Sequence, residues 1–161
     1  MCKISSGFQL PARRLLGFVA LLALAGLCGC GGSDPFPYVK VKGTITYDDG
    51  SLIPADRIEL RFISQAPPLN PQTYPRKGVA NVDPKTGAFE IVTTNHYNDG
   101  VVRGEHKVLV QALRGKKEMQ ADLVPPEYGN LATTPLRVNT DDPSSFNLKV
   151  PKPGAAKAAA K

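Results

Sequence analysis

The stretch HKVLVQAL, residues 106–113, carries the strongest β-strand signal in this sequence. Three aliphatic residues, Val108 to Val110, follow one another in it, a pattern typical of a central strand that is buried on both faces. The segments on either side are polar or contain proline, and we expect residues 95–104 to form turns and residues 114–131 to form a long connection. We therefore expect an all-β domain with this stretch near its centre.

Alternation of apolar and polar residues predicts further strands on both sides of this stretch. They lie at residues 38–47, 58–62, 78–82, 89–91, 135–139 and 146–150. Phe89 and Ile91 are expected to point inward, after a hairpin connection at residues 83–87 in which Pro84 and Gly87 suit the turn. Residues 64–76 contain four prolines and are expected to form a long loop. Seven short strands separated by turn signals predict an antiparallel β-sandwich.

The N-terminal 29 residues have the pattern of a secretory signal peptide. Lys3, Arg13 and Arg14 precede an apolar run at residues 15–27. A membrane-spanning helix needs about 20 apolar residues, so this run is too short to serve as a permanent anchor. We expect residues 1–29 to be removed.

The end of this run resembles the lipobox of bacterial lipoproteins. Leu27 and Gly29 stand three residues and one residue before Cys30, as that motif requires. For Cys28, the preceding residue is Leu27, which is too large for the pattern, so Cys30 is the expected lipid attachment site. The resemblance implies a diacylglyceryl group and usually an additional acyl chain, which together suffice for stable anchoring. It places the domain outside the cytoplasm, on the cell membrane or the outer membrane.

The net charge of +6 does not indicate a nucleic-acid partner. Six of the 20 Lys and Arg residues lie in the leader or the Ala/Lys/Pro tail, which leaves 14 basic and 14 acidic residues in 30–150. A nucleic-acid binder normally carries a basic patch. We expect four parts: a signal peptide at 1–29, a lipidated tether at 30–37, a β-sandwich at 38–150 and a disordered tail at 151–161.

Several segments of the predicted sandwich resemble carboxypeptidase-regulatory-like domains. The segments are VKGTI at residues 41–45, DGSLIPAD with the strand IELRF at residues 49–62, GAFEI at residues 87–91 and GEHKVLV at residues 104–110. The family usually has tyrosine where this chain has His106. The resemblance implies a seven-stranded transthyretin-like (prealbumin-like) sandwich, and it implies an accessory or binding role because the regulatory domain is the non-catalytic part of its namesakes.

The sequence offers little catalytic or metal-binding chemistry. His96 and His106 are the two histidines, and the predicted mature chain has no free thiol, so we expect no catalytic residues, no cofactor and no zinc site. Calcium could be held by Asp48-Asp49 and Asp141-Asp142, although aspartate in such places usually serves turns. The calcium question stays open from sequence alone.

The expected function is a lipid-anchored, non-enzymatic structural or interaction module of the cell envelope. Its partners would be the membrane, through the lipid, and an envelope protein or glycan. An alternative is an accessory carbohydrate- or peptide-binding module whose ligand contacts are Tyr74, Tyr97 and Tyr128, all in predicted loops. A third hypothesis is a hydrolase that uses His96. Convergence of the tyrosines would favour the second, and a carboxylate and a hydroxyl beside His96 would favour the third.

Overall fold

The computed structural model describes residues 34–115, 119–120 and 123–153, within a compact unit that begins at Asp34. Its strands are β1 (Tyr38–Val39), β2 (Gly43–Tyr47), β3 (Arg57–Ser64), β4 (Gly78–Val82), β5 (Ala88–Phe89), β6 (Val92–Thr93), β7 (Val101–Val102), β8 (Glu105–Arg114), β9 (Met119–Gln120), β10 (Arg137–Asn139) and β11 (Asn147–Val150). Two short 3-10 turns, η1 (Pro126–Gly129) and η2 (Pro143–Phe146), are the only helical elements among the described residues. The predicted all-β class is confirmed.

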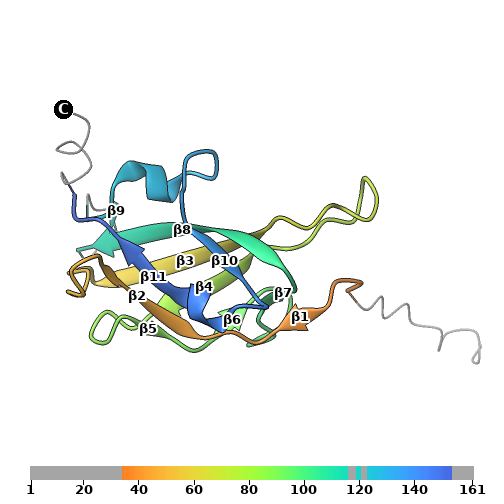
Figure 1. Cartoon of the computed structure of the whole chain (residues 1–161), viewed down its shortest axis with the longest axis horizontal. Coiled ribbons are helices and arrows are strands. Elements are labelled where there is room, and N and C mark those ends of the chain that lie inside the picture. Colours follow the sequence, from red (N-terminus) through yellow and green to blue (C-terminus); the bar gives the residue numbers. More distant parts are fainter. Residues whose placement is uncertain (1–33, 116–118, 121–122, 154–161) are drawn as a thin grey trace, which may run out of the picture. The chain divides into compact units, whose positions relative to one another are not determined.

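The strands form two layers and a short ribbon (Figure 1). A six-stranded sheet has the order β10-β8-β3-β4-β6, with β9 paired to β8. A three-stranded sheet has the order β11-β2-β5, in which β11 runs parallel to β2. The ribbon pairs β1 with β7 at the end of the unit where the described chain begins (Figure 1).

The two layers share one hydrophobic core. Phe62 of β3 contacts Phe89 of β5 and Phe146 of η2, with ring centroids 5.7 and 6.0 Å apart. All three rings are buried, and such aromatic pairs stabilise a core beyond the area they bury. The core residues run from Ile45 to Val150, so the unit that starts at Asp34 contains the whole core. We therefore expect this unit to fold without the leader.

The β8 strand is central, as predicted, but it is not buried on both faces. It pairs with β3 on one side and β10 on the other. Val108, Val110 and Ala112 are buried, whereas Leu109 between them is only half-buried. The prediction failed because an apolar run does not show whether a second layer covers each face. Here only one face of the sheet carries the core.

The turn at residues 83–87 joins two sheets and is not the predicted hairpin. The backbone carbonyl of Asp83 accepts hydrogen bonds from the N–H groups of Thr86 and Gly87, so the turn itself forms. It leads from β4 in the six-stranded sheet to β5 in the three-stranded sheet. Phe89 is buried as predicted, but Ile91 is 43% exposed and the prediction for it is wrong. The chain then returns to the six-stranded sheet, where β6 pairs with β4. Because of this crossing between sheets, the side chains that point toward the core no longer follow the predicted alternation.

Two other predicted segments also differ. The single strand expected at residues 38–47 is divided into β1 and β2, which pair with different sheets. The turn-like segment at residues 95–104 contains β7, whose two valines are buried. The described strands are therefore more numerous than the seven expected, although β3 and β8 are longer than predicted.

Candidate functional site

A hollow of about 860 Å³ lies beside the edge of the six-stranded sheet formed by β4 and β6. Its lining combines two cations, one amide, two hydroxyls, two aliphatic side chains and one phenol, with no carboxylate. The lining residues are Arg76, Lys77, Val79, Asn81, Ile91, Thr93, Thr94 and Tyr97. This combination suits a ligand that carries negative charge and also has an apolar part.

The wall that bears Tyr97 is a loop organised by Asp99. The Asp99 carboxylate accepts hydrogen bonds from the backbone N–H groups of Thr94, Asn95 and His96 at 2.7, 2.8 and 2.7 Å. Burial by itself would raise the pKa of Asp99, but these N–H groups favour the ionised form and the net effect is a lowered pKa. The Asp99 carboxylate is therefore held in its ionised form by the backbone of its own loop.

The same loop is closed by two residues with left-handed backbone conformations. Asn98 has φ of 55° and Gly100 has φ of 93°. A Cβ atom at Gly100 would lie 2.0 Å from the carbonyl oxygen of Val39, so only glycine allows the loop to approach β1 this closely. The hydroxyl of Thr94 donates to the Gly100 carbonyl at 2.6 Å. The loop that carries Tyr97 is thereby fixed to the β1–β7 ribbon.

The opposite wall is tied to the first described residue. Asp34 accepts hydrogen bonds from the backbone N–H of Phe36 at 3.0 Å and from the hydroxyl of Tyr38. The Nε atom of Arg76, which lines the hollow, lies 3.6 Å from the Asp34 carboxylate. Burial, followed by the neighbouring Asp34 carboxylate, raises the pKa of Tyr38 well above its ordinary value. The chain therefore enters the folded unit directly beside the hollow.

The three tyrosines proposed as ligand contacts lie in different surroundings. Tyr97 is 78% exposed and lines the hollow. Tyr74 is 60% exposed and belongs to the connection between β3 and β4, but it does not line the hollow. Tyr128 lies in η1, half-buried against the core, and burial raises its pKa. Only Tyr97 meets the cations of the hollow.

His96 lacks the surroundings of a catalytic base. Its ring Nε2 lies 3.2 Å from the side-chain nitrogen of Asn95, the only hydrogen-bond contact of this ring within the described part of the chain. The nearby Asp99 contacts the backbone N–H of His96 and does not orient the imidazole. A base normally needs a nucleophile and an orienting group within hydrogen-bond reach.

Two of the four aspartates weighed as calcium ligands, Asp49 and Asp142, serve turns. Asp49 accepts a hydrogen bond from the backbone N–H of Ser51 at 3.0 Å, and Asp142 accepts one from the backbone N–H of Ser144 at 3.0 Å. Asp49 also pairs with Lys152 at 2.5 Å. Residues 34–115 and 123–153 contain no cluster of three or more His, Cys, Asp or Glu residues that could hold a metal ion. The turn interpretation accounts for these carboxylates.

His106 is buried in the β8 strand. Its Nδ1 lies 3.1 Å from the carbonyl oxygen of Gly104, and because a carbonyl only accepts, Nδ1 carries the proton. Nε2 is then an acceptor, and it has no partner among the described residues. Burial lowers the pKa of His106 below its ordinary value, against weaker opposing effects of Gly104 and Glu105. His106 is inaccessible to a ligand and belongs to the core.

The predicted lipid attachment site, Cys30, lies outside the described residues. So do the signal peptide at 1–29 and most of the tail predicted at 151–161. In residues 34–115, 119–120 and 123–153, no helix has the length and apolarity that crossing a membrane requires.

Comparisons with protein families, curated proteins and solved structures find no match for this chain. The candidate site is therefore defined by its own chemistry, which places two cations and an exposed tyrosine around a hollow beside Asp34.

Proposed function

We propose that this chain is a bacterial lipoprotein whose β-sandwich acts as a non-enzymatic interaction module at a membrane surface of the cell envelope. Cys30 receives the lipid after residues 1–29 are removed. The sandwich is of the carboxypeptidase-regulatory-like kind, a family whose fold is a seven-stranded transthyretin-like sandwich. The membrane is its first partner, and an envelope protein or glycan is its second.

The attachment of Asp34 to the folded unit is the observation that carries this proposal. Its carboxylate is held by Phe36, Tyr38 and Arg76. Cys30 precedes Asp34 by four residues, which span at most about 14 Å when fully extended. A lipid on Cys30 would therefore hold the sandwich directly on the bilayer, and the end that bears Asp34 would face it.

The non-enzymatic part of the proposal is supported by the surroundings of the two histidines. The ring of His96 contacts an amide and not a carboxylate, and His106 is enclosed in the core. Neither imidazole has a hydroxyl among its hydrogen-bond contacts in the described part of the chain.

A second candidate is the accessory carbohydrate- or peptide-binding module. The presence of Tyr97 in a hollow with polar side chains favours it. The separate positions of Tyr74 and Tyr128 weaken the version in which three tyrosines form one platform. Of the three tyrosines, Tyr97 alone would then contact the ligand.

Intact-mass analysis of the membrane fraction tests lipid anchoring. We expect wild-type protein to have the mass of residues 30–161 plus acyl chains. Cys30→Ser should abolish both the added mass and the membrane association. Cys28→Ser is the matched control and should leave both unchanged, because residue 28 is removed with the leader. An unlipidated wild-type chain, or loss of the lipid in Cys28→Ser, would contradict the assignment of Cys30.

A further inference from the structure

We propose that the hollow beside β4 and β6 docks on phospholipid headgroups of the membrane that holds the anchor. Lys77 and Arg76 attract the phosphates, while Tyr97 and Ile91 enter the interfacial layer. This inference deepens the proposed function and rests on it for the location of the protein, but the affinity for headgroups belongs to the folded unit itself.

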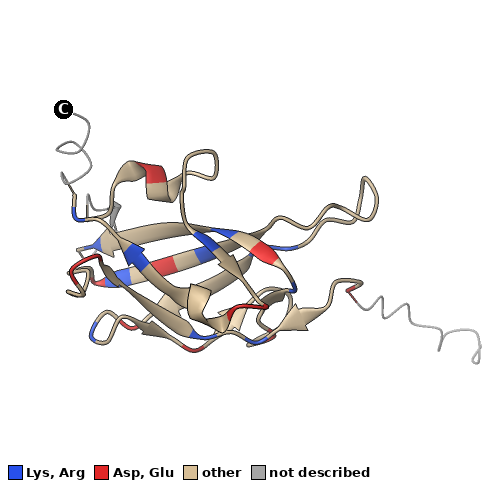
Figure 2. Cartoon of the chain, in the orientation of Figure 1, with Lys and Arg blue, Asp and Glu red and all other residues tan. Residues whose placement is uncertain are grey.

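The charge in the hollow is complementary to a phosphate. Lys77 is exposed, and no carboxylate of the described residues pairs with it. Arg76 pairs with Asp34 through Nε, and its side chain remains 63% exposed. The carboxylate of Asp99 is occupied by three backbone N–H groups of its own loop. Elsewhere on the unit, cations and carboxylates are interspersed along the strands, as β3 shows with Arg57, Glu59 and Arg61 (Figure 2).

Two exposed side chains of apolar character, Tyr97 and Ile91, lie at the hollow itself. Tyr97 and Ile91 line the hollow, and Leu69 and Tyr74 lie in the connection that leads into Arg76. These four make up most of the large apolar side chains that are exposed in the described part of the chain; the others are Leu52 and Leu131. Tyrosine is favoured at membrane interfaces because its ring is apolar and its hydroxyl can remain hydrated.

The hollow lies close to the start of the folded unit, and this position favours a membrane over a soluble ligand. The described chain begins at Asp34, in contact with Arg76, so the wall of the hollow lies at the point where the folded unit begins. The described chain ends at Pro153 after Lys152, which pairs with Asp49 in the turn after β2. Figure 1 shows this turn at the opposite end of the sandwich from β1 and β7. A lipid before Asp34 would therefore bring the hollow, and not the Asp49 turn, to the bilayer.

Vesicle cosedimentation tests the inference without the covalent lipid. The probe protein is residues 30–161 with Cys30→Ser, which contains the whole core. It should sediment with vesicles of phosphatidylcholine mixed with phosphatidylglycerol, and less with pure phosphatidylcholine. Lys77→Gln should weaken binding about fivefold, which corresponds to about 1 kcal/mol for one basic residue at an anionic surface. Tyr97→Ala should weaken it as well.

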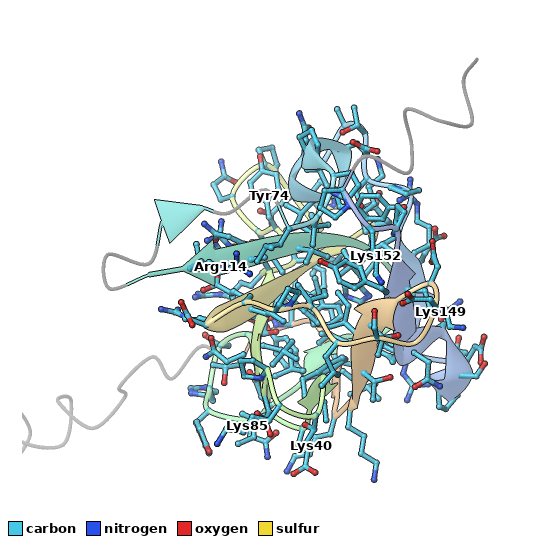
Figure 3. The ribbon with its side chains drawn as sticks, turned by 90° about the vertical axis from the view of Figure 1, so that its left-hand side faces the viewer. Lys40, Tyr74, Lys85, Arg114, Lys149 and Lys152 are labelled. Carbon is cyan, nitrogen blue, oxygen red and sulfur yellow. The ribbon has the colours of Figure 1, made fainter. Side chains whose placement is uncertain are left out.

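Lys149→Gln is the matched control. Lys149 is also an exposed lysine and lies on β11, in the other sheet (Figure 3), and its loss should leave vesicle binding unchanged. Both lysines are exposed, so unchanged circular dichroism and thermal unfolding are expected for both variants. The inference is overturned by absent vesicle binding, by equal losses in the two lysine variants, or by displacement with soluble glycerol phosphate, which would make the hollow a site for a free phosphate ester. Because the probe carries no lipid, any of these results is independent of whether Cys30 is lipidated.

Discussion

The buried imidazole of His106 makes the stability of the folded unit depend on pH. The imidazole is fully buried, Nδ1–H donates to the Gly104 carbonyl, and Nε2 has no partner among the described residues. A buried polar atom left unpaired costs about 1–3 kcal/mol of stability. Phenylalanine has nearly the same shape without the acceptor, and the Gly104 carbonyl would keep its hydrogen bond from the backbone N–H of Thr140.

We therefore predict that His106→Phe raises the free energy of unfolding by about 1 kcal/mol at neutral pH. The gain should increase as the pH falls. Because burial lowers the pKa of His106 in the folded protein below its unfolded value of about 6.5, the unfolded state binds more protons in the window between the two pKa values. The contribution of neutral His106 to the free energy of unfolding of the wild type is fully present above about pH 6.5 and declines as the pH falls through this window.

Urea denaturation between about pH 5.5 and 7.5 measures this difference, in a range where most carboxylates stay ionised. His96→Asn, which changes an exposed histidine, is the matched control for the loss of an imidazole. A His106→Phe protein that is less stable than the wild type, with an unchanged pH slope, would show that the imidazole has an unrecognised partner.

At the same scale, the candidate site could be predicted only in part. Tyr97 was identified because it stands in a polar loop, but Tyr74 and Tyr128 met the same criterion and do not line the hollow. Arg76 and Lys77 follow a proline-rich segment and show no local signal of a site. They become part of one because β4 pairs with β6, a contact between segments more than ten residues apart.

At the scale of the strands, Gly43 in β2 and Gly50 in the turn after β2 are required for different physical reasons. A Cβ atom at Gly43 would lie 2.2 Å from the carbonyl oxygen of Phe146, in the element that precedes β11. Gly50 has φ of 81°, with nothing within 4 Å of a Cβ atom. Gly43 is therefore needed for the approach of two elements, and Gly50 for a left-handed turn.

We predict that Gly43→Ala lowers the free energy of unfolding by at least about 1–3 kcal/mol, because β2 and η2 must separate. Gly50→Asn should be close to neutral, because asparagine adopts the left-handed conformation and finds open space. Thermal unfolding of the two variants beside the wild type measures both effects. Equal destabilisation by the two substitutions would contradict the close approach of β2 to η2.

The strands also show what periodicity can and cannot specify. Alternation located β2, β3 and β4, because each has one face on the core along its whole length. It failed at Ile91, where the chain leaves β5, which pairs with β2, and enters β6, which pairs with β4. Alternation records which side chains are buried, but the choice of hydrogen-bonding partner depends on distant strands. The short β7 was missed because two buried valines are too few to establish a period.

For the whole molecule, binding to the membrane depends on both the local charge at the hollow and the short tether. Residues 30–150 are neutral overall, so attraction to a membrane requires a local excess of cations rather than a high net charge. Lys77, which pairs with no carboxylate of the described residues, provides this excess beside the point where the folded unit begins. A short tether keeps the hollow close to the bilayer, where a weak affinity is sufficient because the local concentration of headgroups is high.

The most direct measurement uses the absence of tryptophan from the chain. In the lipidated protein reconstituted into vesicles, Tyr97→Trp introduces a single fluorophore at the hollow. We predict a blue-shifted emission that is quenched by phospholipids labelled with a quencher at the headgroup. Leu52→Trp, at a 39% exposed position in the turn region far from Asp34, should show neither effect. Equal emission and equal quenching at the two positions would contradict the account, because the sandwich would then be tethered to the membrane without docking through its hollow.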